Sequence, residues 1–432
     1  MTGAALLLAV ALPHVQQVAP GVWAAGFSDR RGSANGGWFT TATETVLIDL
    51  DPAVYGEEVR RITGKPVRAT IPEGAPVKRY DGALHLTGPN VLFAGPEVVN
   101  GPRAKLAGRD TAAWLGTLAQ LEKLQPAVVV PGFGSWGGPE IIGRQRRFLA
   151  ELRRQVAYGI SMGRPVEAIE REVMLPATYY AWMPYDNPRP EDLRHVYGEL
   201  TVPAAPFGGK VLASGPHALV LIADRYHEPE HLEAGLRTAF EATGVTPHFA
   251  VDVRALSAAS LARVQLLVIL RDGMLWPEGP SKPYQIWMTP EQEKAVVAFV
   301  EGGGGFLNLH NSMGLYPKEG PFLNLVGGRY IGHGPLERFR VEVVDRGHPV
   351  TRGVEDYFAA DEQHTPPYDE GRMRLLLRNR SEEGKTAAAG WAYEPGKGRL
   401  CHLASGHTRE SLEHPMFQRL LRNAVGWCLR RE

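Results

Sequence analysis

Two patterns of apolar and polar positions divide the chain near residue 205. Before it, short apolar runs between polar turns predict strands, and helices are predicted over EEVRRITG, residues 110–123 and residues 139–158. From Ala218 on, continuous apolar strands alternate with amphipathic helices, which predicts a parallel sheet with helices on both faces. The five strands expected in that sheet are ALVLIAD, TPHFAVDV, VQLLVIL, GFLNL and RLCHLAS.

A proline- and aromatic-rich stretch, residues 176–208, separates the two regions and is predicted to be an extended connector. The expected domains are therefore residues 15–175 and 209–432. Residues 1–14 contain an apolar run from Ala4 to Leu12 that resembles a short signal peptide, although the usual preceding basic residue is missing. Export and a cytoplasmic location both remain open.

The amino-acid composition argues against several classes of partner and of site. The 47 basic and 47 acidic residues balance, so no overall charge attracts nucleic acid or an anionic membrane, and neither is expected as a partner. A hydrophobic content of 44% without low-complexity tracts is typical of a globular protein. Only Cys401 and Cys428 are present, too few for a disulfide framework or a thiolate metal site.

The first region resembles metallo-β-lactamase-like hydrolases of the αββα fold. The resemblance is carried by VLIDLD, VLFAGPEVVNG and DTAAWLGTLAQLEKLQPAVVVPGFGSWGG, in that order. The family's HxHxDH metal cluster is absent, and Pro96 and Phe133 stand where later ligands are expected. The resemblance therefore implies a degenerate, non-catalytic domain that holds no zinc, with its sheet available for homo-oligomer formation. Residual metallo-hydrolase activity would require zinc bound there.

In the second region, polar side chains follow the predicted strands. They include His227 after ALVLIAD, Arg271 and Asp272 after VQLLVIL, His310 and Asn311 after GFLNL, and His407 and Glu410 after RLCHLAS. Ligands of parallel α/β sheets bind at the carboxyl ends of the strands. The sequence therefore predicts a site for a polar ligand at this edge.

Several motifs in this region resemble the trehalose-utilisation (ThuA-like) family, whose fold is a doubly wound parallel sheet of the flavodoxin and class I glutamine amidotransferase type. The motifs are GGGGFLNLHNSMG, LVGGRYIGHGP, DYFAADEQH and GWAYEPGKGRLCHLASGHTRE. Amidotransferases carry a catalytic cysteine at the strand-to-helix elbow, where this chain has His310. Without a thiol there, glutamine hydrolysis through a thioester is excluded. His310 is expected to serve acid–base chemistry, metal ligation or hydrogen bonding, unless it only ties the turn to its neighbours.

The candidate site follows from these motifs. The predicted catalytic residues are His310, His407, Glu410, Asp361 and Glu362, and the predicted substrate-binding residues are His227, Arg271, Asp272, Asn311, His333, His364 and Trp391. Trp391 is able to stack on a sugar, unless it serves core or rim packing, the commoner use of tryptophan. The DEQH cluster is able to bind sugar hydroxyls, share a proton or hold a metal ion. No residue is assigned as a metal ligand, and the cofactor is unknown.

The ThuA resemblance implies a role in carbohydrate metabolism with a small sugar ligand. A set of imidazoles and carboxylates without a nucleophile suits acid–base chemistry on a sugar or keto-sugar, as in a lyase, isomerase or hydrolase. The alternative is a non-catalytic carbohydrate-binding or scaffold protein. Convergence of His227, His310, His333, Asp361 and His407 within one pocket, at hydrogen-bond or metal-ligand range, would favour the enzyme. If they scatter or are plugged by side chains, the binding protein is favoured.

Overall fold

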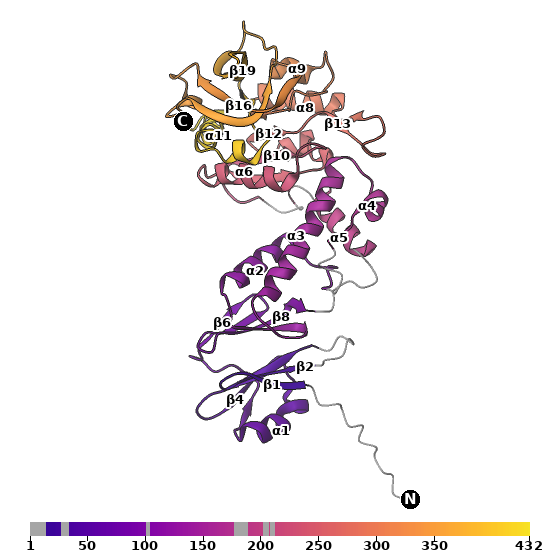
Figure 1. The fold of residues 1–432 in the computed structure, drawn as a ribbon, viewed down its shortest axis with the longest axis vertical. Coiled ribbons are helices and arrows are strands. Elements are labelled where there is room, and N and C mark those ends of the chain that lie inside the picture. Colours follow the sequence, from indigo (N-terminus) through magenta and orange to yellow (C-terminus); the bar gives the residue numbers. More distant parts are fainter. Residues whose placement is uncertain (1–13, 27–33, 101–103, 177–188, 202–206, 208–211) are drawn as a thin grey trace, which may run out of the picture. The chain divides into compact units, whose positions relative to one another are not determined.

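The computed structural model describes residues 14–26, 34–100, 104–176, 189–201, 207 and 212–432. The chain forms two compact units, and Figure 1 labels their elements. Unit 1 comprises Met1–Arg153 and Val173–Asp192, and unit 2 comprises Arg154–Glu172 and Leu193–Glu432. The division differs from the expected one, because residues 154–172 belong to unit 2. The expected signal peptide lies, except for His14, outside the described residues.

Unit 1 contains two sheets. One has the order β1 (His14–Ala19), β2 (Val22–Gly26), β3 (Gly36–Thr40), β4 (Thr45–Ile48) and β5 (Val67–Arg68), and the other β6 (Val77–Tyr80), β7 (Ala83–Leu86), β8 (Val91–Asn100) and β9 (Val128–Gly134). Its helices are α1 (Pro52–Thr63), α2 (Thr111–Lys123) and the first part of α3 (Glu140–Ser161). Asp51 and Asp110 cap α1 and α2 by accepting hydrogen bonds from backbone N–H groups of the first turn. The predicted strands and helices of this region are confirmed, and the metallo-β-lactamase resemblance stays a prediction.

The expected extended connector is partly helical, which corrects the prediction. Helix α4 (Val166–Glu172) precedes it, and α5 (Pro190–Leu200) lies within it. Leu193 and Val196 are three residues apart and buried, so α5 has an apolar face, and Pro190 occupies a first-turn position that proline favours. Residues 177–188 of the stretch lie outside the described part of the chain.

Unit 2 is built on a nine-stranded mixed sheet of the order β11-β10-β12-β15-β20-β19-β18-β16-β17. The first five are β10 (His217–Ile222), β11 (Thr246–Ala250), β12 (Leu266–Leu270), β15 (Gly305–Leu309) and β20 (Arg399–Leu403), and all are parallel. These are the five predicted strands, so the parallel prediction is confirmed for this half.

The other half of the sheet was not predicted. Strands β16 (His333–Val343), β17 (Tyr357–His364), β18 (Arg374–Arg380) and β19 (Thr386–Tyr393) extend it in antiparallel pairing. In β16, buried Phe339 and Val341 alternate with exposed Arg338 and Arg340, the pattern of a strand with one solvated face. The wholly parallel sheet of the prediction is therefore corrected to a mixed one.

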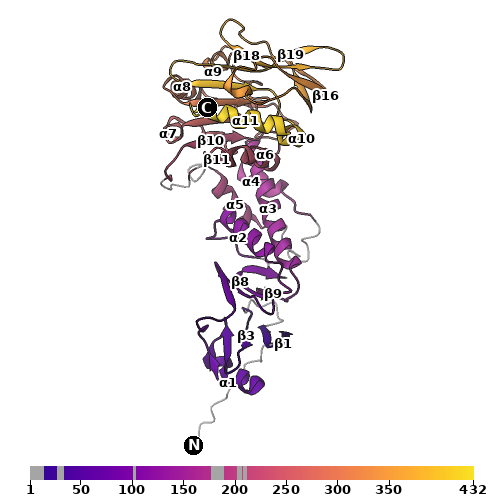
Figure 2. The same cartoon turned by 90° about the vertical axis from the view of Figure 1, so that its left-hand side faces the viewer.

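Helices cover both faces of the parallel half. One hydrophobic cluster packs α8 (Pro290–Glu301) and α9 (Pro321–Val326) against alternate residues of β10 and β12, such as Leu219 and Leu267. On the other face, α6 (Pro229–Glu241) and α11 (Pro415–Cys428) contact each other, and between them they contact β10, β15 and β20. Figure 2 shows α6 and α11 beside β10.

Shorter elements complete unit 2. They are α7 (Ala258–Leu261), α10 (Arg409–Glu413), the 3₁₀ helices Val253–Ala255 and Pro349–Thr351, and the hairpin of β13 (Met274–Leu275) and β14 (Gln285–Ile286). Among the described helices, none has both the length and the apolar content needed to cross a bilayer.

Candidate active site

His310 occupies a tight turn at the carboxyl end of β15. Its φ angle of +49° lies in the left-handed region, which side chains with a β-carbon rarely adopt. The backbone N–H of His310 donates to the carbonyl of Leu403 at 2.8 Å, and Nδ1 lies 2.9 Å from the carbonyl of Ala404. Because a carbonyl only accepts, Nδ1 carries the proton and Nε2 keeps its lone pair. Glycine is needed at Gly406, where a β-carbon would lie 3.1 Å from that of His310 and φ is +146°.

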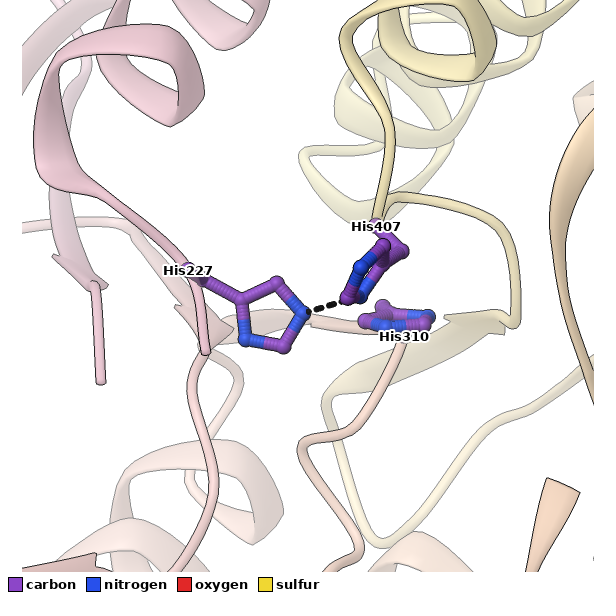
Figure 3. Close-up of side chains that lie close together, drawn as sticks. All are labelled: His227, His310 and His407. Carbon is purple, nitrogen blue, oxygen red and sulfur yellow. Dashed lines mark hydrogen bonds between the residues drawn. The ribbon is translucent and has the colours of Figure 1, made fainter. Parts of the chain in front are cut away.

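Two side chains of the loop after β10, Asp224 and His227, and one of the loop after β20, His407, form a hydrogen-bonded relay. Nδ1 of His227 lies 2.8 Å from Oδ1 of Asp224, and Nε2 of His227 lies 3.0 Å from Nδ1 of His407. The exposed fraction of the side chain rises along this relay from 1% at Asp224 to 2% at His227 and 26% at His407. Figure 3 shows the rings of His227 and His407 meeting beside His310. The relay can therefore pass a proton between His227 and the partly exposed ring of His407, while the buried carboxylate of Asp224 orients His227.

Glu362, on β17, is the centre of the site. Its Oε2 atom lies close to four imidazole nitrogens: 3.4 Å from Nδ1 of His407, 3.5 Å from Nε2 of His364, and 3.7 Å from Nε2 of both His310 and His333. Glu362 and His364 are two residues apart on β17, so they share a face of the strand. His333 on β16 is the register partner of His364. Both halves of the sheet therefore contribute to this cluster.

The pKa values of the clustered side chains are shifted in different directions. Burial and the neighbouring imidazoles hold the pKa of His310 well below its usual range, so its ring is neutral at pH 7. Burial opposes protonation of His227, but the charge of Asp224 and its hydrogen bond outweigh burial and raise the pKa of His227. Burial and the adjacent His227 lower the pKa of His407. At Glu362, the surrounding imidazoles outweigh burial and lower the pKa.

Asp361 lies beside Glu362 in sequence but contacts the loop of residues 406–407 in place of the imidazoles. It is fully buried, and its carboxylate accepts hydrogen bonds from the backbone N–H of Gly406 at 2.8 Å and of His407 at 3.2 Å. Burial raises the pKa of this carboxyl group. Asp361 thus holds the loop that carries His407, a positioning role in place of the predicted catalytic one.

Two predicted substrate-binding residues, Asn311 and Asp272, hold Asp224, and a third, Arg271, bonds backbone carbonyls. Asn311 donates from Nδ2 to Oδ2 of Asp224 at 2.9 Å, and the backbone N–H of Asp272 donates to the same oxygen at 3.0 Å. Burial and the charge of Asp224 raise the pKa of Asp272 to about 7. Arg271 is fully buried and donates from Nη2 to two backbone carbonyls. Contact of Arg271 with a sugar would require its exposure, so its position corrects that prediction.

Two further predicted residues lie apart from the cluster. Trp391 is fully buried, donates from Nε1 to the carbonyl of Val326 at 3.0 Å, and packs against Tyr368 and His402. Its ring offers no face to a sugar, which corrects the stacking prediction. Glu410 is exposed in the first turn of α10, where negative charge stabilises a helix. Its catalytic role stays a prediction.

Two residues of the site, Asp224 and Tyr330, were not predicted from the sequence. Asp224 closes the apolar strand ALVLIAD three residues before His227, and this carboxylate at a strand end was the available signal. The ring of Tyr330 lies 5.2 Å from that of His364 and 6.0 Å from that of His333. Burial and the charge of Glu362 raise the pKa of Tyr330. No sequence signal distinguished Tyr330 from other loop tyrosines.

Two overlapping groups of side chains in unit 2 are spaced to share a metal ion: His227, His310 and His407 in one, and His310, Glu362 and His364 in the other. In the first group, two of the nitrogens already bond each other. In the second, Nε2 of His310 and Nε2 of His364 are buried and have no hydrogen-bond partner among the described residues. The second group therefore has free donor atoms.

A separate cavity of about 470 Å³ lies within unit 2. Its lining includes Lys318, Arg329, Asp369 and Arg372. It shares no residue with the histidine cluster, so the cavity and the candidate chemistry are distinct features.

Fold and site together define unit 2 as an α/β domain with an imidazole and carboxylate site at the carboxyl edge of its parallel strands. The sequence profile of the ThuA family, described as trehalose utilisation, matches residues 218–428. This segment is therefore a ThuA domain, as the sequence motifs predicted. A search of curated proteins finds no match to the chain.

Solved structures give a weaker likeness to about half of the chain. A ThuA-like protein from Parabacteroides merdae is 17% identical over 50% of this chain and 90% of its own, with a TM-score of 0.41. A ThuA-like protein from Bacteroides uniformis is 19% identical over 51% and 94%, with a TM-score of 0.39. A cytoplasmic protein from Salmonella typhimurium is 15% identical over 49% and 98%, with a TM-score of 0.38. Scores this low carry no argument, so the assignment rests on the family match.

Proposed function

We propose that unit 2 is a carbohydrate-converting enzyme that acts by acid–base chemistry on a sugar or keto-sugar. The observation that carries this proposal is the relay of Asp224, His227 and His407, which leads from the interior to a partly exposed ring beside Glu362. The match to a trehalose-utilisation family supports the substrate class. Four of the five residues whose convergence in one pocket would favour an enzyme lie close together, namely His227, His310, His333 and His407. The fifth, Asp361, holds the loop that carries His407.

In this mechanism His407 exchanges a proton with the substrate. Asp224 accepts from Nδ1–H of His227, which leaves Nε2 of His227 to share a proton with Nδ1 of His407. The position of that shared proton determines whether the ring of His407 acts as a base or as an acid. Removal of a proton next to a sugar carbonyl, or protonation of a departing glycosidic oxygen, requires such a group.

Thioester chemistry is not part of the proposal. Cys401 lies in β20 and Cys428 in α11, and both are buried. Burial raises the pKa of the Cys428 thiol to about 12, so this group stays protonated at neutral pH. The elbow presents His310 where an amidotransferase has its nucleophile.

The test is incubation of the protein in D₂O with a panel of sugars and 3-keto-sugars, followed by NMR. We expect one class to be converted or to take up deuterium next to its carbonyl. His407→Ala should slow this by roughly 10²- to 10⁴-fold, the usual contribution of an acid–base group. Glu413→Gln is the matched control, because it neutralises an exposed carboxylate at the end of α10 that pairs with Arg409, and it should keep wild-type rates.

Two results would contradict the proposal. One is the absence of conversion and exchange with every member of the panel, and the other is a wild-type rate in His407→Ala. Binding of a sugar without conversion, seen as a raised melting temperature, would favour the alternative of a carbohydrate-binding protein.

A further inference from the structure

We infer that His310, Glu362 and His364 form a binding site for one divalent transition-metal ion. The inference deepens the proposed function. The metal site itself is independent of that function, and only the statement that the ion would contact a sugar rests on it. Two imidazole nitrogens and one carboxylate oxygen make up the donor set. His310 comes from the turn after β15, and Glu362 and His364 come from β17.

The spacing of the donor atoms fits an ion of this size. Oε2 of Glu362 lies 3.7 Å from Nε2 of His310 and 3.5 Å from Nε2 of His364. Ligand bonds of about 2.0–2.1 Å in a tetrahedral site place neighbouring ligand atoms roughly 3.3 Å apart. An inward movement of a few tenths of an ångström would therefore bring Oε2 to the spacing of bonded ligands with each nitrogen, and all three atoms lie within 4.8 Å of one another. Both distances exceed those of ordinary hydrogen bonds, so an ion would not have to displace a short contact.

The two nitrogen atoms are also unsatisfied. Nε2 of His310 and Nε2 of His364 are buried and have no hydrogen-bond partner among the described residues. A buried polar atom without a partner destabilises the fold, and a bound ion would remove that cost. The proton on Nδ1 of His310, held by the carbonyl of Ala404, directs the lone pair of Nε2 into the site. Metal-bound histidines are commonly oriented by such a bond on the other ring nitrogen.

The other imidazoles have different roles. His227 and His407 bond each other and belong to the relay. His333 is one-third exposed, and its Nε2 lies 3.7 Å from Oε2 of Glu362. It is therefore placed to complete the coordination or to meet the substrate. Imidazole with carboxylate, and without thiolate, favours zinc, iron, manganese, cobalt or nickel over calcium and magnesium. An ion here would polarise a sugar carbonyl or hydroxyl beside the relay.

The experiment uses the full chain, freed of metal by dialysis against a chelator and titrated with Co²⁺, with visible absorption as the signal. We expect cobalt bands that saturate at one ion per chain, and elemental analysis should give the same stoichiometry for zinc. Glu362→Gln keeps the size of the side chain and should weaken cobalt binding by roughly 100-fold or more, beyond the 10- to 100-fold effect of an outer-shell partner. Glu413→Gln removes the same charge from an exposed residue outside the cluster and should bind cobalt like wild type.

The inference fails if the wild-type protein binds no stoichiometric cobalt or zinc, or if Glu362→Gln retains wild-type affinity while its melting curve shows a folded protein. The titration needs no sugar, so it is independent of the proposed function. Metal binding without sugar conversion would refute the function and keep the site. Undiminished conversion by metal-free protein that binds neither ion would refute the site and keep the function.

Discussion

Substitution of Asp224 by asparagine should destabilise unit 2 although it changes a single atom. The carboxylate is 1% exposed and accepts four hydrogen bonds. Its donors are the backbone N–H of Tyr226 at 2.8 Å and Nδ1 of His227 at 2.8 Å on Oδ1, and the backbone N–H of Asp272 at 3.0 Å and Nδ2 of Asn311 at 2.9 Å on Oδ2. An amide has one oxygen and one NH₂ group, so in either orientation the NH₂ faces two donors.

The expected magnitude follows from those contacts. Two hydrogen bonds are lost, and bonds to a charged group contribute about 1.5–3 kcal/mol each. Relief of the repulsion between Asp224 and Asp272 offsets part of this loss. We therefore expect Asp224→Asn to lower the free energy of unfolding of unit 2 by roughly 2–4 kcal/mol.

Hydrogen exchange of β10 peptides, followed by mass spectrometry, measures unit 2 separately from unit 1. A loss of 2–4 kcal/mol corresponds to exchange about 30- to 1,000-fold faster, provided that β10 opens with the whole unit. Asp272→Asn is the control, because its amide oxygen can still accept from the backbone N–H of Met274 as the carboxylate does. An exchange rate in Asp224→Asn within about threefold of wild type would refute the reasoning. The hydrogen bonds to the Asp224 carboxylate would then contribute far less than about 1.5–3 kcal/mol each.

Two further predictions concern buried groups. Trp391→Phe should cost about 1–3 kcal/mol of unfolding free energy, because the carbonyl of Val326 loses its donor, while the KM for the sugar found in the NMR screen stays unchanged. Urea unfolding and steady-state kinetics test the two halves of this prediction, and a raised KM would restore the stacking role of Trp391. Burial and the charge of Asp224 raise the pKa of Asp272 in the folded state from 3.8 to about 7. Between these pH values the folded state binds more protons than the unfolded state. The free energy of unfolding should therefore fall as the pH rises from about 4 to about 7. Unfolding measured across this range should lose that slope in Asp272→Asn, and an unchanged slope would show that another group causes it.

The parallel half of the sheet and the location of the site could be predicted from the sequence. Strands buried on both faces, such as LLVIL in β12, are continuously apolar, and the carboxyl ends of parallel strands meet at one edge. His227, His310 and His407 follow three of these strands and lie together as expected. Local pattern and a general rule of topology were sufficient for that part.

The orientation of individual side chains could not be predicted in the same way. Asp361 and Glu362 are adjacent and chemically alike, yet strand alternation turns one towards the 406–407 loop and the other towards the imidazoles. Which one faces the site depends on how β17 pairs with β16, a long-range register that composition does not reveal. Trp391 was misjudged for a related reason, because its neighbours Tyr368 and Val326 are distant in sequence.

The position of β20 in the sheet determines when the site can form during synthesis. It is the last strand of the sheet in sequence, yet it lies between β15 and β19, where the two halves join. During synthesis, a nascent chain that has released every other strand still has an open seam between those two neighbours. His310 also depends on β20, since the carbonyls of Leu403 and Ala404 hold its backbone and its ring. The imidazoles around Glu362 would therefore come together only when β20 is inserted, and an incomplete chain would lack the site.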